Sequence, residues 1–170
     1  MAVKGIQDFY QKAIERDFAR DFQFRVLDLP VAGIDDTDLV YVTTASLPGK
    51  SISNQPTPFM GLSFNVPGSI TYPGSDAWSL TFRCDEAHEI REKLLNGVKR
   101  IFDDATSTGD YGVPDEVASM VLVGKDLEPV KTYRFIGMYP VSVGDMAYNI
   151  EGTGTPMTFD ATFAYQFWRN

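Results

Sequence analysis

The stretch "AWSLTFRCDEAHEIREKLLNGVKRIF", residues 77–102, changes its hydrophobic period halfway along. In its first half, apolar residues alternate with polar ones, which is typical of a β-strand with one buried face. The alternating residues are Trp78, Leu80, Phe82 and Cys84. In its second half, apolar residues recur every three to four positions, as on one face of a helix. That stripe consists of Ala87, Ile90, Leu94, Leu95, Val98, Ile101 and Phe102. The stretch predicts a strand that runs directly into an amphipathic helix.

Asp85 stands where the period changes and is the expected helix cap. A carboxylate at that place accepts hydrogen bonds from the free backbone N–H groups of the first turn. Glu86 and Glu89 fall in the expected first turn, where the helix dipole favours negative charge, and the last turn carries two basic residues. Glu89 and Lys93 are spaced for an ion pair one turn apart. The acidic residues of "DEAH" therefore have a structural explanation.

The rest of the chain is mostly β in character. Alternating or β-branched segments predict strands within 20–30, 38–46, 117–124, 130–144, 145–151 and 157–168. An amphipathic helix is expected at 5–18, a turn at 35–38, a loop at 103–116, and a long Pro-rich loop or loose hairpin at 47–73, with one strand at 59–65.

We predict a mainly β fold in a single domain, residues 1–170. Two packed antiparallel β-sheets would form a sandwich or barrel-like structure, because adjacent alternating strands favour antiparallel pairing. One α-helix is inserted after a middle strand, and a short helix lies at the N-terminus. The apolar content of 44% is enough for such a core.

The charge and cysteine content narrow the functional classes. A net charge of −8 argues against tight binding to a phosphate backbone, which needs clustered Lys and Arg. The negative charge is compatible with DNA as a cargo, because an acidic surface repels DNA and lets it pass without binding. Cys84 is the only cysteine, so no internal disulfide forms. Because the sequence has neither a signal-peptide segment nor an apolar run long enough for a bilayer, we expect synthesis in a cytoplasm and no membrane anchor.

Two short motifs suggest a nucleotide-driven motor. "TASLPGKS", residues 44–51, ends like a phosphate loop, and a DEAH sequence follows. A phosphate loop needs glycine where Thr44 stands and must open into a helix, which Pro56 and Pro58 would break. A helicase also needs two nucleotide-binding domains. We therefore interpret "PGKS" as a turn that follows a strand.

The sequence predicts no other catalytic or metal-binding site. His88 is the only histidine, which rules out a His-based metal cluster. Cys84 and His88 approach each other at the strand–helix junction, which raises the hypothesis of a thiol nucleophile, but no third orienting group is evident. The acidic residues 35–38 lack the spaced ligands of a calcium loop. No catalytic residue, metal ligand or cofactor is expected.

Several stretches together resemble the tail tube protein family of contractile-tailed bacteriophages. They are "RDFARDFQFRV" (16–26), "TASLPGK" (44–50), "AWSLTFRCDEAHEIREKL" (77–94), "YRFIGMYPVSVGDMAY" (133–148) and "MTFDATFAYQFW" (157–168). They occur in the family's order and span nearly the whole chain, and 77–94 is the strongest match. The departures fall in the loops, at 48–73 and 103–116.

The resemblance implies a non-enzymatic virion protein whose hexameric rings stack into the tail tube, through which DNA leaves the capsid. Its partners would be further copies of itself, the tail sheath protein, a baseplate tube initiator and a tail terminator, with assembly in the host bacterial cytoplasm. The expected sheath-facing element is the inserted helix. One alternative is a related tube-like protein of a type VI secretion or phage-derived injection system, or a baseplate tube initiator. An alternative of a different class is a β-sandwich ligand-binding module.

Two segments are the expected subunit and ring interfaces. The 48–73 segment is too long and Pro-rich for a simple connection, so we expect ring-to-ring contacts there, through Pro56, Pro58, Phe59 and Met60. The final strand carries apolar residues on both faces near its end, so we expect a neighbouring subunit to cover Phe167 and Trp168. Trp168 as a ligand platform is the alternative.

Overall fold

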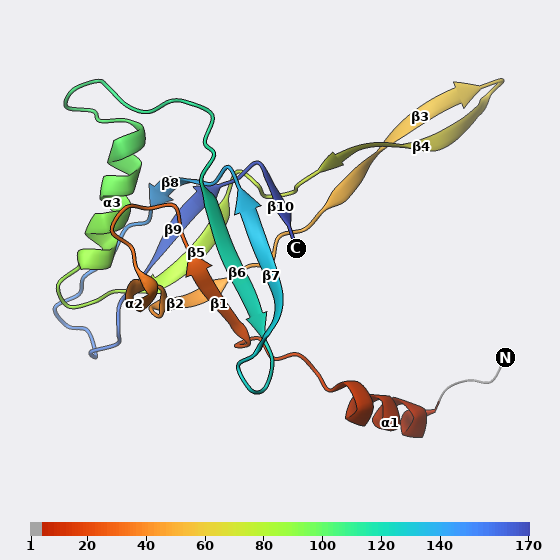
Figure 1. Ribbon diagram of the computed structural model, residues 1–170, viewed down its shortest axis with the longest axis horizontal. Coiled ribbons are helices and arrows are strands. Elements are labelled where there is room, and N and C mark those ends of the chain that lie inside the picture. Colours follow the sequence, from red (N-terminus) through yellow and green to blue (C-terminus); the bar gives the residue numbers. More distant parts are fainter. Residues whose placement is uncertain (1–4) are drawn as a thin grey trace.

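The computed structural model describes residues 5–170, and its strands form two four-stranded sheets and one separate two-stranded ribbon (Figure 1). The strands are β1 (Phe24–Asp28), β2 (Val42–Ala45), β3 (Ser51–Phe59), β4 (Leu62–Thr71), β5 (Trp78–Arg83), β6 (Val117–Val123), β7 (Pro129–Ile136), β8 (Tyr139–Val143), β9 (Thr158–Ala164) and β10 (Phe167–Arg169). The helices are α1 (Ile6–Arg16), α2 (Asp36–Leu39) and α3 (Glu89–Ile101).

Both larger sheets are antiparallel. The first has the order β1-β6-β7-β10 and the second the order β2-β5-β9-β8. Helix α3 is inserted after β5, beside β8 at the edge of the second sheet (Figure 1). The predicted fold class is confirmed. The ribbon β3–β4 takes the hairpin form of the loop or loose hairpin expected at 47–73.

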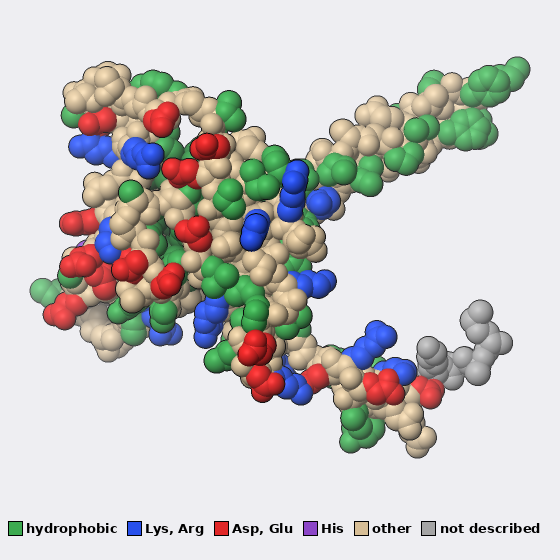
Figure 2. All heavy atoms as spheres, in the orientation of Figure 1, with side chains coloured by type: hydrophobic (Ala, Val, Ile, Leu, Met, Phe, Trp, Pro, Cys, Tyr) green, Lys and Arg blue, Asp and Glu red, His purple; other side chains and the backbone are tan. Residues whose placement is uncertain are grey.

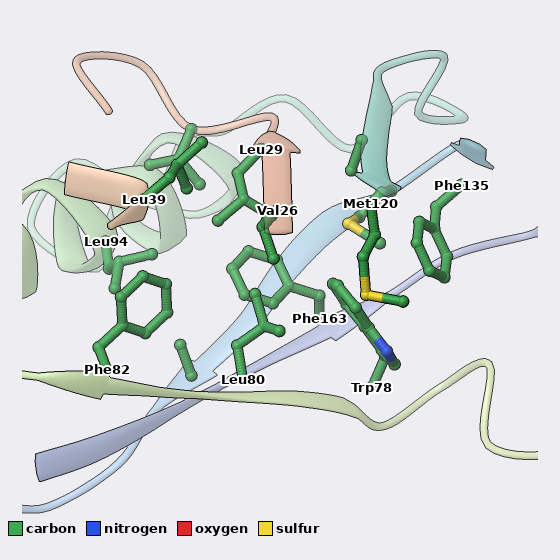
Figure 3. Close-up of a cluster of buried hydrophobic side chains, with 14 of the residues drawn as sticks. Val26, Leu29, Leu39, Trp78, Leu80, Phe82, Leu94, Met120, Phe135 and Phe163 are labelled. Carbon is green, nitrogen blue, oxygen red and sulfur yellow. The ribbon is translucent and has the colours of Figure 1, made fainter. Parts of the chain in front are cut away.

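Aromatic side chains from both sheets form the core. Phe82, Phe135 and Phe163 are fully buried, and Trp78 of β5 packs on Phe135 of β7 with ring centroids 4.5 Å apart (Figure 3). The predicted alternation in β5 is confirmed, because its residues 78, 80 and 82 are buried while 79 and 83 are exposed. Full burial of such side chains is the main stabilising term of a domain of this size.

Helix α3 begins later than predicted. His88 adopts a left-handed backbone with φ of 57°, so the helix starts at Glu89, and Glu86 lies outside its first turn. The Asp85 carboxylate still accepts hydrogen bonds from the N–H groups of Glu89 (2.9 Å) and Ile90 (3.4 Å). Asp85 therefore accepts hydrogen bonds from N–H groups of the first turn, although His88 and not Asp85 is the residue at the N-cap.

The buried face of α3 is narrower than predicted. Ile90 and Leu94 are buried, whereas Leu95 and Phe102 are exposed. Lys93 forms its ion pair with Asp38 at 2.7 Å rather than with Glu89, because the 35–38 segment packs beside the helix. Gly97 lets the helix pack closely on Val31, since a Cβ there would lie 2.9 Å from a methyl group of Val31.

The 35–38 segment, predicted to be a turn, opens the short helix α2. The Asp35 carboxylate accepts hydrogen bonds from the N–H groups of Thr37 and Asp38, which caps the helix. Leu39 is buried and attaches α2 to the core.

Three strand predictions need correction. Residues 145–151 form no strand, and the strands predicted within 130–144 and 157–168 each divide into two. The chain passes from the first sheet to the second between β7 and β8, and back between β9 and β10. Tyr165 is buried at the second crossing, so the alternation continues through it and hides the break. Within residues 5–170, no helix has the length and apolarity needed to span a bilayer.

Candidate assembly surfaces

The ribbon β3–β4, residues 51–71, projects from the two-sheet body as an arm (Figure 1). Its strands pair from Ser51–Thr71 at the root to Phe59–Leu62 at the tip. The tip turn contains Met60 and Gly61, both with positive φ. The strand predicted at 59–65 is therefore wrong, because this turn lies inside it. The prolines that suggested a loop are accommodated within a regular hairpin.

The prolines fit because of where they pair. Pro56 lies opposite Asn65, Pro58 opposite Ser63, and Pro67 opposite Asn54. Proline lacks an N–H group, so a paired strand tolerates it where that position points away from the partner strand. Each outer edge of the arm consequently lacks donors that a third strand would need. Each edge is thereby a poorer template for a third strand, and the faces of the arm remain available for binding.

One face of the arm is apolar. The arm has no charged residue, and apart from the half-exposed Ser53 its residues are exposed. Strand pairing places Phe59, Leu62, Phe64 and Val66 on the same face. Figure 2 shows hydrophobic side chains along one side of the arm and at its tip. An isolated two-stranded hairpin is marginally stable in water, and a contiguous apolar surface of this kind marks an interaction site.

The C-terminal strand β10 is an edge of the first sheet. Phe167 and Trp168 are half-buried, and Trp168 already has partners in its own chain. Its indole N–H donates to the Gly49 carbonyl at 3.1 Å, and its ring lies 5.5 Å from that of Tyr133. The second apolar face at the C-terminus is thus explained in part by intramolecular packing. The free edge of β10 remains available to a neighbouring chain.

Helix α1 is a third exposed surface, one that the sequence analysis did not propose as an interface. Within the described chain, α1 buries none of its residues, and it projects from the body (Figure 1). Its apolar residues Ile6, Phe9, Tyr10 and Ile14 are all exposed. The pattern that predicted an amphipathic helix was therefore correct, but the subunit does not cover the apolar face.

The Gly-Lys-Ser motif does not form a phosphate site. Ser51 opens strand β3 rather than a helix, so no helix N-terminus faces a bound anion. The Lys50 ammonium lies 4.4 Å from the centroid of the Trp168 ring and 5.5 Å from that of Tyr72. This lysine binds aromatic rings at the root of the arm.

Cys84 and His88 do meet, with Cys84 Sγ 3.0 Å from His88 Nδ1. Tyr148 Oη lies 3.4 Å from the other ring nitrogen, Nε2. Burial, reinforced by the negative charge of Asp85, raises the pKa of the Cys84 thiol. A lowered pKa is one way in which a cysteine nucleophile is activated, and the Cys84 thiol does not have it. Among residues 5–170, no group of three or more acidic, His or Cys side chains is arranged to hold a metal ion.

A cavity of about 390 Å³ lies between α3 and residues 110–116. Tyr111 and Tyr139 are its aromatic lining among the described residues, beside proline, glycine and charged side chains. Its lining also includes the apolar residues Ile101, Val113 and Met138. Trp168, the residue expected as a ligand platform, is not part of this cavity and lies where the arm meets the body.

Comparison with known proteins agrees with this architecture. The family model described as phage tail tube protein matches residues 23–170. The tail tube protein gp19 of Enterobacteria phage T4 is 28% identical over 157 residues, covering 89% of this chain and 91% of the relative. The corresponding protein of phage T6 is 27% identical with the same coverage.

Solved structures share the fold at low identity. A chain of the tube-terminating cap of the anti-feeding prophage superposes with a TM-score of 0.63 at 12% identity, covering 91% of each chain. A chain of that prophage's baseplate gives 0.62 at 13% identity, covering 89% of this chain and 94% of the other. Given the family match over residues 23–170, this chain belongs to the phage tail tube protein family.

Proposed function

We propose that six copies of this chain form a ring, that the rings stack into a phage tail tube, and that genome DNA passes through the lumen during ejection. The observation that carries this proposal is the arm: 21 uncharged residues, 51–71, that leave an apolar face uncovered in the subunit. A tube subunit meets further copies on several sides, which supplies a cover for such a face. The role is structural and not enzymatic.

The arm makes the ring-to-ring contact. With strands of 9 and 10 residues, it reaches roughly 30 Å at about 3.3 Å per residue, far enough to extend onto an adjacent ring. Pro56 and Pro58 keep its outer edge from adding strands, while Phe59 and Met60 present apolar side chains at the tip. Docking by an apolar face therefore buries surface without starting uncontrolled strand addition.

Ring closure uses the edges of the sheets. The edge strands are β1 and β10 in the first sheet and β2 and β8 in the second, and β8 has helix α3 beside it. The outward backbone groups of β1, β2 and β10 can pair with a neighbouring subunit. Phe167 and Trp168 lie on such an edge, which is why we keep the C-terminal strand as a subunit interface. Joining edges around a ring would leave the assembled tube with protected strands.

Charge supports the remaining roles. The net charge of −8 argues against tight binding to DNA, as expected of a protein that DNA passes without being held. Figure 2 shows many acidic side chains on the part of the body near α3, away from the arm. We assign α3 to the outer surface, facing the tail sheath protein. The baseplate tube initiator and the tail terminator would contact the two ends of the stack. The protein would be assembled in the host bacterial cytoplasm and reside in the virion.

Electron microscopy of the purified protein tests the proposal. We expect the wild-type chain to form rings or tubes with a central lumen, alone or with an initiator. The double variant Phe59→Ser, Phe64→Ser should stay folded and fail to form tubes, because it removes apolar contacts from the docking face. Val130→Ser, which changes an exposed apolar residue of β7, is the matched control. Tubes of normal length from the double variant would contradict the arm's role.

Truncation tests the C-terminal interface with single rings, rather than tubes, as the readout, because Trp168 also contacts the base of the arm. Removing residues 166–170 deletes the edge strand β10 and should leave a folded subunit that is impaired in forming rings. Normal ring formation would refute that interface. Rings or tubes would also be expected of a tube protein of an injection system, which shares this fold. A chain that stays monomeric under all conditions would favour a ligand-binding module.

A further inference from the structure

The arm joins the body through two irregular segments, residues 46–50 before β3 and residues 72–77 after β4. Among the described residues, β3 and β4 pair only with each other. The direction of the arm therefore depends on what holds these two segments. We refer to them together as the root of the arm.

We propose that Trp168 and Lys50 clamp the root and fix the direction of the arm before two rings meet, which makes both of them positioning residues for tube assembly. The Trp168 indole N–H donates to the Gly49 carbonyl at 3.1 Å. The Lys50 ammonium lies 4.4 Å from the Trp168 ring centroid and 5.5 Å from that of Tyr72. Gly49 and Lys50 precede β3 and Tyr72 follows β4, so the clamp holds both strands of the arm.

The clamp is anchored in the body. Trp168 belongs to β10, which pairs with β7, and its ring rests against Tyr133 of β7 at 5.5 Å. The chain's other tryptophan, Trp78, donates its indole N–H to the Ser46 carbonyl at 2.8 Å. Both tryptophans therefore hold carbonyl groups of the same irregular segment, 46–50, which has no strand partner of its own. The C-terminus lies beside the root in Figure 1.

The arm is also closed at the end next to the root. Ser51 Oγ and Thr71 Oγ1, on the first and last paired residues of the arm, are 2.6 Å apart. Tyr165, at the crossing that leads to β10, donates its backbone N–H to the Ser75 carbonyl at 2.8 Å. The two strands thus leave the body as a unit whose angle is set where β10 touches it. A preset angle lowers the entropy that is lost when the arm docks.

The position of the clamp explains why it acts on direction rather than on folding. Trp168 is only half-buried, and β10 has three residues at the edge of a sheet. Lys50 is exposed. Removing either contact leaves the buried aromatic core in place. The inference rests on the proposed role of the arm in ring stacking, and the experiment below separates the two.

Distance measurement between spin labels tests the clamp directly. Labels at Met60→Cys on the tip and Asp126→Cys on the body, in a Cys84→Ala background, report the direction of the arm. The labelled full-length chain is measured below its critical concentration for tube growth, so that only distances within one unassembled subunit are read. Lys50→Met and Trp168→Leu should broaden the distance distribution. Lys50→Arg should restore it, because the cation is kept, and Lys131→Met, an exposed lysine of β7, should not alter it.

The same variants are then assembled into tubes. We expect Lys50→Met and Trp168→Leu to raise the critical concentration for tube growth by roughly threefold to tenfold, the factor expected when a cation–π contact or a hydrogen bond is lost. The denaturation midpoint of Lys50→Met should equal that of Lys131→Met. Trp168→Phe keeps the ring but not the donor, so it should fall between Trp168→Leu and the wild type.

The outcomes separate the clamp from the stacking role. Unchanged distance distributions in both clamp variants would overturn the clamp. Broadened distributions with an unchanged critical concentration would overturn its role in assembly, provided that Phe59→Ser, Phe64→Ser abolishes tubes. Broadened distributions together with normal tubes from that tip variant would leave the clamp standing and refute ring stacking by the arm.

Discussion

The two-sheet body and the arm both consist of antiparallel strands, but their apolar side chains have different surroundings. In the body, Phe82, Phe135 and Phe163 are fully buried between the sheets. In the arm, Phe59 and Phe64 retain 64% and 50% of their accessible surface. Apolar residues of the same type therefore stabilise the subunit in one region and remain available for association in the other. Hydrophobicity alone therefore does not identify the core of a subunit that assembles with further copies.

A pair of matched truncations gives the largest expected effect. Phe135→Ala should lower the free energy of unfolding by about 3–5 kcal/mol, because it removes a buried ring that packs on Trp78 and Tyr165. Phe64→Ala should change the free energy of unfolding of the unassembled subunit by less than about 0.5 kcal/mol. Chemical denaturation followed by tryptophan fluorescence measures both. Equal losses would mean that the arm is part of the folding unit, and the comparison would fail.

Asp85→Ala should have a moderate effect confined to the body. The Asp85 carboxylate accepts from two first-turn N–H groups of α3, and losing such a cap costs about 1 kcal/mol. Asp85→Asn keeps an acceptor oxygen and should recover most of the loss. At a temperature where the variant is folded, tubes should form normally, since α3 and the arm lie at opposite sides of the body in Figure 1. An assembly defect in the folded variant would show that the two regions are coupled.

The β5–α3 unit could be predicted from the sequence because each half has its own hydrophobic period and the residues at the change cap the helix. The crossings between sheets could not, because Tyr165 is buried and continues the alternation of β9 toward β10. The regular pairing of the arm could not be predicted from the sequence, because prolines such as Pro56 and Pro58 would break a central strand. A two-stranded ribbon has outer edges that accept them.

The candidate interfaces were predictable only in part. Pro56, Pro58, Phe59 and Met60 were singled out for their unusual segment, and the structure places them on an exposed arm. The partner of Trp168 is a backbone carbonyl at Gly49, 119 residues away, and no sequence pattern records such an acceptor. The exposure of α1 could not be predicted either, because an amphipathic pattern does not say which chain covers the apolar face.

The pair Lys93–Asp38 should contribute a smaller, pH-dependent effect within the body. The hydrogen bond to Asp38 raises the pKa of Lys93. A raised lysine pKa means that the stabilisation is fully present below the pKa of an unfolded lysine and is lost as pH rises through the folded value. Lys93→Met should therefore lower the unfolding midpoint slightly at neutral pH, less than Asp85→Ala does. Above the raised pKa its midpoint should converge with that of the wild type.

The unfolding midpoints of Lys93→Met and of the wild type are measured by denaturation at pH values from neutral to strongly alkaline. Lys99→Met is the control for a lysine of the same helix with a looser ion pair, 3.9 Å from Asp103. A difference between Lys93→Met and the wild type that persists unchanged at the highest pH would show that the aliphatic part of Lys93, and not its charge, ties α2 to α3.

Deleting residues 1–16, which include α1, should have the smallest effect on the subunit. Within the described chain α1 buries no residue, so its removal takes nothing from the core. The ion pair of Asp17 with Lys125 and the hydrogen bond from Val123 N–H to the Gln23 carbonyl lie beyond the deletion and remain. We expect an unfolding midpoint equal to that of the full chain, measured by thermal denaturation. If the midpoint falls by several degrees, the apolar face of α1 packs on its own subunit, and α1 belongs with the body. An unchanged midpoint shows that the subunit leaves the apolar face of α1 uncovered, as it does the apolar face of the arm.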